Sequence, residues 1–94
     1  MRSDIQAFFL GASQSDAYTG TAGVSDAVGA QTRLVRVVVT TDAFIAIGKT
    51  ASATTSDAFL PANTVEYFII NAGEKVSAVQ VSAGGTLYIT EMTK

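Results

Sequence analysis

From Thr32 to Met92 the chain is a series of short runs rich in β-branched and aromatic residues, each ended by turn-forming residues. Val, Ile, Thr, Tyr and Phe favour strands, whereas Gly, Asp and Pro interrupt them. No long window repeats apolar residues at the spacing i, i+3, i+4 and i+7, which argues against helices. The sequence therefore predicts an all-β fold, a small β-sandwich or jelly-roll-like barrel of about seven to nine short antiparallel strands.

The turn residues set the expected strand boundaries. Strands are predicted at residues 5–10, 32–40, 43–48, 58–63, 65–71, 75–81 and 86–92, with one or two further short strands within 11–31. Segments 11–31 and 49–57 are otherwise predicted to be mainly loop, because Gly11 ends the first run and Gly, Ser and Thr crowd both segments. Pro61 lacks a backbone N–H donor, so its strand should lie away from the middle of a sheet. The 94 residues should form a single domain, 1–94, with a radius of gyration of roughly 12 Å.

Two pairs of runs have the pattern of strands joined by tight turns. In "SAVQVSAGGTLYITEM", residues 77–92, Gly84 and Gly85 separate two alternating stretches, which predicts a β-hairpin. In its second strand Leu87 and Ile89 share one face, so both are expected in the core. The runs 32–40 and 43–48, separated by "TD", are likewise predicted to be two strands and a tight turn.

Several of the predicted strands carry apolar residues on both faces, for example "VVV" at 37–39 and "YFII" at 67–70. A small sandwich has one interior, so a second apolar face needs a cover. That cover is either residues 11–31 folded back over the sheets or the surface of another chain. Charged residues make up only 15% of the chain, which favours the second alternative. The candidate interface residues are Phe8, Phe9, Tyr18, Arg33, Arg36, Phe44, Tyr67 and Phe68.

The arginines of this set, Arg33 and Arg36, are three residues apart and therefore lie on opposite faces of an ideal strand. Two interpretations remain open for them. They are charges that keep a sheet edge hydrated, or one of them reaches a carboxylate on a neighbouring subunit.

The residue inventory excludes several kinds of chemistry. The chain has no His and no Cys, which removes the commonest general base, the thiol nucleophile and the preferred zinc ligands. We therefore expect no enzyme activity, no metal site and no cofactor. A net charge of −2 with scattered charges argues against a nucleic-acid partner. No apolar run approaches the roughly 18 residues of a membrane helix, so no membrane partner is expected.

A family resemblance spans residues 32–92, about two thirds of the chain. "TRLVRVVVTTDAFIAIG" and "FLPANTVEYFIINAGEKVSAVQVSAGGTLYITEM" resemble small structural proteins of tailed-bacteriophage virions. The shared pattern is a Val-rich strand, a "TTD" turn, a strand ending in Gly, an "LPA" kink, a "GEK" turn and a final "GGTLYITE" segment.

The resemblance implies a capsid decoration or cement protein with a β-sandwich or jelly-roll-like fold. It implies the major capsid protein as partner, a homo-oligomer such as a trimer or dimer, and a place on the capsid surface after synthesis in the host cytoplasm. Two alternatives remain: another small virion component from the tail, fibre base or head-tail connection, or a glycan-binding module that presents Tyr18, Tyr67 or Tyr88.

Overall fold

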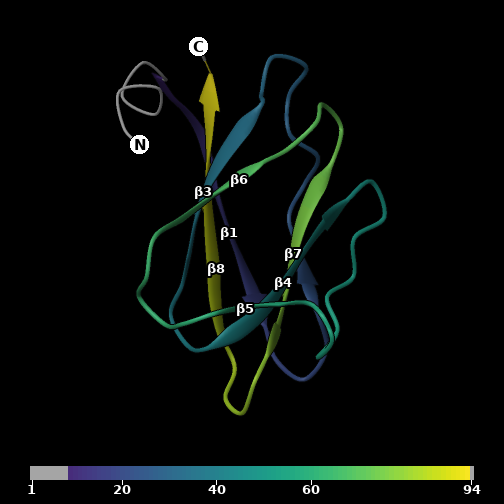
Figure 1. The fold of residues 1–94 in the computed structure, drawn as a ribbon, viewed down its shortest axis with the longest axis vertical. Helices are drawn as coiled ribbons and strands as arrows, with labels where there is room; N and C mark the ends of the chain where they lie inside the picture. The colour runs from purple at the N-terminus through teal and green to yellow at the C-terminus, as the bar shows by residue number, and fades with distance from the viewer. Residues whose placement is uncertain (1–8, 94) are drawn as a thin grey trace.

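The computed structural model describes residues 9–93, which form two antiparallel four-stranded sheets (Figure 1). The strands are β1 (Phe9–Tyr18), β2 (Gly23–Val24), β3 (Leu34–Val39), β4 (Ala43–Gly48), β5 (Ala58–Leu60), β6 (Glu66–Ile69), β7 (Lys75–Gln80) and β8 (Gly85–Thr93). One sheet has the order β1-β8-β3-β6 and the other β2-β7-β4-β5. The all-β prediction is confirmed.

The strand pairing defines a jelly roll. β1 pairs with β8, β2 with β7, β3 with β6 and β4 with β5, so the first half of the chain runs antiparallel to the second half as one long ribbon. Rolling up this ribbon adds the pairs β3–β8 and β4–β7. The result is the double-sheet arrangement of a jelly roll, with one long edge strand, β1, and three short ones, β2, β5 and β6.

Both predicted pairs of consecutive strands are connected differently from a hairpin. β7 pairs with β2 and β4, and β8 pairs with β1 and β3, so the Gly-Gly connection crosses from one sheet to the other. The turn between β3 and β4 makes the same crossing. The hairpin prediction is wrong, because each of these strands pairs with strands other than its chain neighbour and turns its buried face toward the opposite sheet. Facing sheets can bury these faces against each other, whereas a hairpin sets its two strands in one plane.

The first strand is longer than its sequence predicts. The expected strand at 5–10 was to end at Gly11, but β1 continues through Gly11 to Tyr18; residues 5–8 lie outside the described part of the chain. A bulge between Leu10 and Ser13 shifts its register against β8. Residues 11–31 therefore contribute β1 and β2 in the planes of the two sheets, and do not fold over an outer face.

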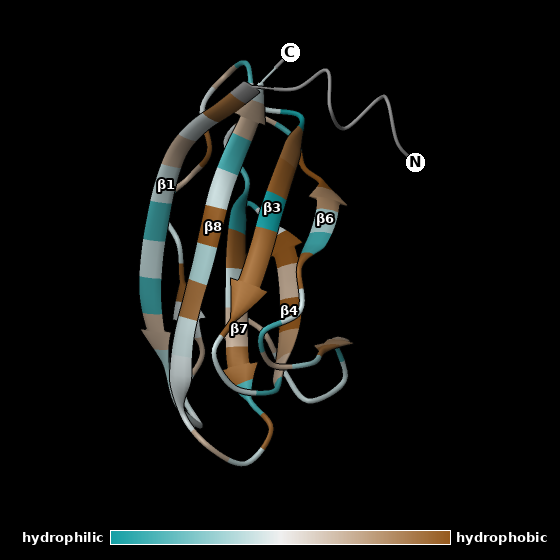
Figure 2. Cartoon of the chain, turned by 90° about the vertical axis from the view of Figure 1, so that its left-hand side faces the viewer, coloured by the Kyte–Doolittle hydropathy of each residue, from teal (hydrophilic) through white to brown (hydrophobic). Residues whose placement is uncertain are grey.

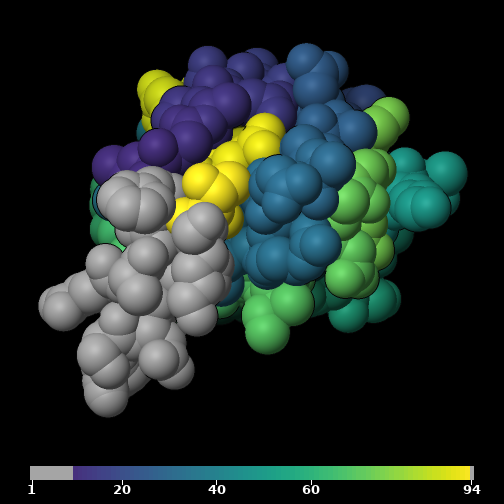
Figure 3. Space-filling model, turned by 90° about the horizontal axis from the view of Figure 1, so that it is seen from above, coloured from purple at the N-terminus to yellow at the C-terminus, as the bar shows by residue number. Residues whose placement is uncertain are grey.

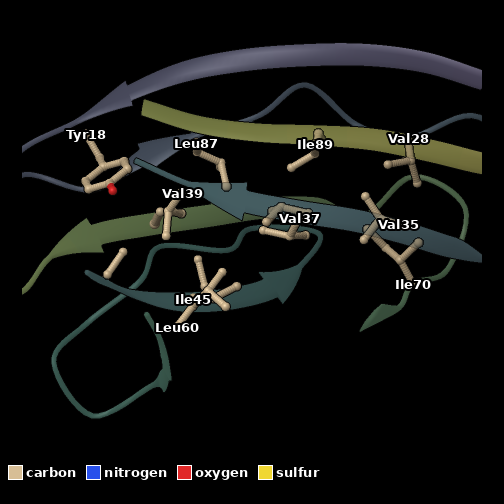
Figure 4. Packing of buried hydrophobic residues seen from close by; sticks show 13 residues of the cluster. Tyr18, Val28, Val35, Val37, Val39, Ile45, Leu60, Ile70, Leu87 and Ile89 are labelled. Carbon is tan, nitrogen blue, oxygen red and sulfur yellow. The ribbon is translucent and has the colours of Figure 1, made fainter. Parts of the chain in front are cut away.

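The core lies between the sheets and consists mainly of Val, Leu, Ile and Ala side chains (Figure 4). β3 contributes Val35, Val37 and Val39, and β8 contributes Leu87 and Ile89, all of them buried. Each such side chain stabilises the fold by roughly 1.5–3 kcal/mol. The predicted core positions Leu87 and Ile89 are confirmed.

Segment 49–57 covers part of one outer face. Ser77, on the side of β7 that points away from the core, is fully buried because Ala53 lies over it and donates its backbone N–H to the Ser77 Oγ at 2.8 Å. Among residues 10–93, the two most exposed large hydrophobic side chains, Ile69 and Leu10, lie on the other sheet.

Candidate interaction surface

An apolar row crosses the outer face of the β1-β8-β3-β6 sheet from edge to edge. Leu10 is the partner of Met92, Met92 of Leu34, and Leu34 of Ile69. Cross-strand partners share a face of the sheet, and Met92 lies on the side of β8 opposite to the core residues Leu87 and Ile89. We call these four residues the apolar row.

The apolar row is most exposed at its two ends. Ile69 is 81% exposed and Leu10 is 71% exposed, whereas Leu34 is half-buried and Met92 is buried. Seen from above, the C-terminal end of β8 lies between β1 and the start of β3 (Figure 3). The exposed part of the row is therefore divided between the β1 and β6 edges of the sheet. Exposed apolar side chains rimmed by polar residues are typical of a binding surface.

Aromatic and cationic residues continue the surface below the apolar row. Arg36 lies between Thr90 and Tyr67, and the next row pairs Val38 with Tyr88. Tyr88 is 48% exposed. Tyr, Arg and Met are enriched in the energetically dominant parts of protein interfaces. We call the apolar row together with Arg36, Val38, Tyr67 and Tyr88 the outer face (Figure 2).

The β2-β7-β4-β5 sheet exposes a smaller apolar site. Phe44 and its partner Phe59 are in edge-to-face contact, with ring centroids 6.0 Å apart, and Phe59 is 54% exposed. The segment around Ala53 covers the neighbouring part of this sheet. The Phe44–Phe59 pair is therefore a local contact and lacks the edge-to-edge extent of the outer face.

The eight candidate interface residues are divided among several places. Arg36 and Tyr67 lie side by side on the outer face, and Phe44 lies on the opposite sheet. Phe68 packs against the core from β6. Phe8 and the side chain of Phe9 lie outside the described residues.

Arg33 lies just before β3 and is exposed. Its guanidinium donates to the backbone carbonyls of Ala30 and Thr32 at 3.0 and 3.1 Å. These two bonds orient the side chain at the end of the sheet, next to Ile70, whose N–H donates to the Arg33 carbonyl.

The prediction that Tyr18 belongs to an interface is wrong, because its side chain is only 2% exposed and lies in the core. Its hydroxyl donates to the Thr41 carbonyl at 2.7 Å and accepts from the Thr41 N–H at 3.2 Å. These bonds tie the end of β1 to the turn between β3 and β4. A buried aromatic ring with a satisfied hydroxyl supports the fold and is unavailable to a partner.

Six of the eight outer-face residues are absent from the candidate set, and three of these, Leu10, Ile69 and Tyr88, are exposed. Ile69 stands in "YFII", where consecutive apolar residues must place some side chains away from the core. Tyr88 alternates with the core residues Leu87 and Ile89, which already indicated an outward position. No comparable signal marks Leu10, because the continuation of β1 beyond Gly11 depends on pairing with β8.

The carboxyl group of Asp16 lies in an unusual environment for an acidic side chain. It lies opposite Leu87, with its Oδ2 buried and lacking a hydrogen-bond partner among the described residues. Burial, and secondarily the negative charge of Asp26, raise the pKa of its carboxyl group above 3.8. Within residues 9–93 no group of three or more acidic side chains is placed to hold a metal ion.

The described segment contains no helix long and apolar enough to cross a membrane. Neither a protein-family model nor a curated protein sequence matches the chain.

Proposed function

We propose that the chain is a non-enzymatic structural protein of a tailed-bacteriophage virion, a decoration or cement protein that binds the major capsid protein on the head shell. The observation that carries this proposal is the outer face, an apolar row from edge to edge beside two Tyr and one Arg. The resemblance of residues 32–92 supplies the kind of partner. The jelly-roll topology agrees with it, since this fold recurs in viral capsid proteins.

The outer face suits a protein that binds a large, symmetric partner. The apolar row supplies burial, Arg36 supplies a donor for carboxylates or carbonyls, and the Tyr hydroxyls supply further hydrogen bonds. A contact of this kind can be weak for one copy. Many copies bound at symmetry-related positions of a shell, bridging its subunits, together resist its dissociation.

The test is co-sedimentation with head shells assembled without the chain, from the virus that encodes it. The unmodified chain should bind in a saturable ratio and raise the temperature at which the shells disassemble. Leu10→Ser and Tyr88→Ser should each weaken binding at least about tenfold, roughly 1.4 kcal/mol, because each removes an exposed contact of the outer face.

Phe59→Ser is the matched control, because it removes from the opposite sheet an aromatic side chain about as exposed as Tyr88, 54% against 48%. It should bind shells like the unmodified chain. Absence of co-sedimentation by the unmodified chain contradicts the proposal. If Phe59→Ser loses binding while Leu10→Ser and Tyr88→Ser retain it, the binding surface is the other sheet.

A glycan-binding module is the other candidate with an observation in its favour, since Tyr67 and Tyr88 are both exposed on the outer face. Aromatic faces can stack on sugar rings. The burial of Tyr18 leaves these two side chains, on strands separated by β3, as the platform. A glycan array probed with the unmodified chain and with Tyr88→Ser distinguishes this candidate: specific hits that Tyr88→Ser abolishes support it.

A further inference from the structure

The free edge of β6 presents unpaired backbone groups beside exposed apolar side chains. Among residues 9–93, β6 pairs with β3 alone. The Ile70 N–H donates to the Arg33 carbonyl at 3.0 Å, which fixes the pattern of the antiparallel ladder, because hydrogen-bonded and non-hydrogen-bonded pairs alternate. Phe68 and Glu66 therefore bond to β3, whereas the backbone N–H and C=O groups of Tyr67 and Ile69 point away from it.

The neighbouring ladder agrees with this assignment. The Thr40 N–H donates to the Thr86 carbonyl at 3.1 Å, so the even-numbered residues of β3 bond to β8. The odd-numbered residues, including Val35 and Val37, are left to bond to β6. The outward direction of the Tyr67 and Ile69 backbone groups thus follows from two independent bonds.

The other sheet edges have features that discourage pairing with another chain. β1 contains a bulge and places Ser13 and Ser15 on the outer side of its free edge, and bulges and polar residues blunt an edge. β2 has two residues and β5 has three, followed by Pro61. β6 has no bulge and no Pro, and Glu66 is its one charged residue. It is the edge best suited to accept a strand.

We propose that a second copy of this chain pairs with this edge, β6 against β6 in antiparallel orientation about a two-fold axis through Phe68. In this register Tyr67 of each copy lies opposite Ile69 of the other, and each of these pairs exchanges both backbone hydrogen bonds. The two four-stranded sheets then form one continuous sheet. An interface of this kind is self-complementary, as a two-fold dimer requires.

Side-chain contacts favour the same register. Tyr67 and the Ile69 of the second copy become direct cross-strand neighbours on the outer face, and aromatic–aliphatic pairs of this type stabilise sheets by roughly 0.2–1 kcal/mol each. The pairing covers Ile69, the most exposed of the large apolar side chains in residues 10–93. It also joins the apolar rows of the two copies into one longer surface.

Charge complementarity identifies a second copy as the occupant. In this register Glu66 lies opposite Ile70 of the second copy, and that Ile70 is bonded to Arg33 of its own chain. Glu66 of one copy and Arg33 of the other thus share a cross-strand row, about 10 Å apart at their Cα atoms, which is two strand spacings. Both side chains are exposed and long enough to meet across Ile70. The two-fold axis creates this opposite-charge pair twice.

The first experiment measures the mass of the chain by sedimentation equilibrium at micromolar concentration. The unmodified chain should have a mass near twice 9.7 kDa. Ile69→Pro should be a folded monomer, because its lost N–H faces the free edge and not β3. Ile69→Val keeps the N–H and most of the apolar side chain, so it should remain a dimer.

The second experiment tests the register and remains informative if Ile69→Pro fails to fold. Glu66→Arg and Arg33→Glu should each raise the dimer dissociation constant about tenfold or more, because each places like charges in one row. The double variant, Glu66→Arg with Arg33→Glu, should restore dimerisation.

Three results overturn the proposal: a monomeric unmodified chain, a folded Ile69→Pro that remains dimeric, or a double variant no better than the single ones. Because these measurements use the chain alone in solution, they are independent of shell binding. Failure of the proposed function would leave the dimer standing, and failure of the dimer would leave shell binding standing.

Discussion

Individual side chains decide how the two sheets are held at the end where β1 finishes. Tyr18 fills the core with its ring and uses its hydroxyl to satisfy both backbone groups of Thr41. Gly85, its partner on β8, leaves room for this arrangement: a Cβ there would lie 2.7 Å from the Tyr18 hydroxyl. Gly85 was expected as a turn residue, but it begins β8 and is required for packing.

Tyr18→Phe should lower the free energy of unfolding by about 1–3 kcal/mol, because the change leaves partly buried backbone groups of Thr41 without their partner. Urea denaturation followed by circular dichroism measures this. Tyr88→Phe is the matched control: Tyr88 is on the exposed outer face, so the change should stay within about 0.5 kcal/mol. Equal effects of the two substitutions would contradict the role assigned to the Tyr18 hydroxyl.

Asp16 should make stability depend on pH. Its folded-state pKa is raised, so the folded chain binds this proton more tightly than the unfolded chain does. The stabilising contribution of the protonated carboxyl is complete below pH 3.8, the ordinary value, and is lost as the pH rises through the raised value. Asp16→Asn should therefore gain stability relative to the unmodified chain between about pH 3 and pH 7.

Denaturation midpoints of both proteins across this range test the expectation. Asp26→Asn removes the negative charge that is the smaller cause of the raised pKa of Asp16. In a chain with this substitution, the pH dependence of stability due to Asp16 should be smaller. A stability difference between Asp16→Asn and the unmodified chain that is the same at every pH would contradict the assignment.

At the scale of elements, local sequence patterns predict strands well and their partners poorly. The run 43–48 coincides with β4, and the runs for β3 and β5 to β8 are placed within a few residues. β1 extends beyond its predicted end because its polar residues are held by the backbone of β8, a pairing remote in sequence. The turns at 41–42 and 82–85 indicate a change of direction, but contain nothing that says which sheet the next strand joins.

The candidate interaction surface, like the strand pairing, could be predicted from the sequence only in part. The two-faced runs "VVV" and "YFII" predict that an outer face exists. Arg36 and Tyr67 were both candidate interface residues, but their pairing across β3 and β6 is known only from the structure. The apolar row could not be predicted, because it joins four strands whose register is set by tertiary pairing. Tyr18 has the composition of a contact residue, yet packing in the fold assigns it to the core.

The junction between the two sheets at β1 and β2 depends on Gly23. A Cβ at Gly23 would lie 2.1 Å from the Ala17 carbonyl oxygen, whereas a Cβ at Gly48 would meet nothing within 4 Å. Gly23→Ala should destabilise the fold by about 1–3 kcal/mol through overpacking against backbone. Gly48→Ala should be neutral or stabilising by up to about 1 kcal/mol. Thermal unfolding of the two variants measures the difference, and similar melting temperatures would contradict this account of the junction.

At the scale of the whole molecule, the residues that stabilise the fold and the residues of the proposed contact lie on opposite sides of the same sheet. The interior between the sheets supplies stability through Val, Leu and Ile burial. Segment 49–57 covers part of the β2-β7-β4-β5 sheet, and the proposed contact with a shell uses the outer side of the β1-β8-β3-β6 sheet. With β6 paired to a second copy, the outer faces of the two chains would lie on one continuous sheet, which would double the surface offered to a shell.

The measurement that tests the proposed function most directly is a cryo-electron microscopy reconstruction of head shells saturated with the chain. We expect ordered density on the shell exterior, with the β1-β8-β3-β6 sheet against the capsid protein and the Phe44–Phe59 pair facing outward. Shells without added density, or density attached through the β2-β7-β4-β5 sheet, would contradict it.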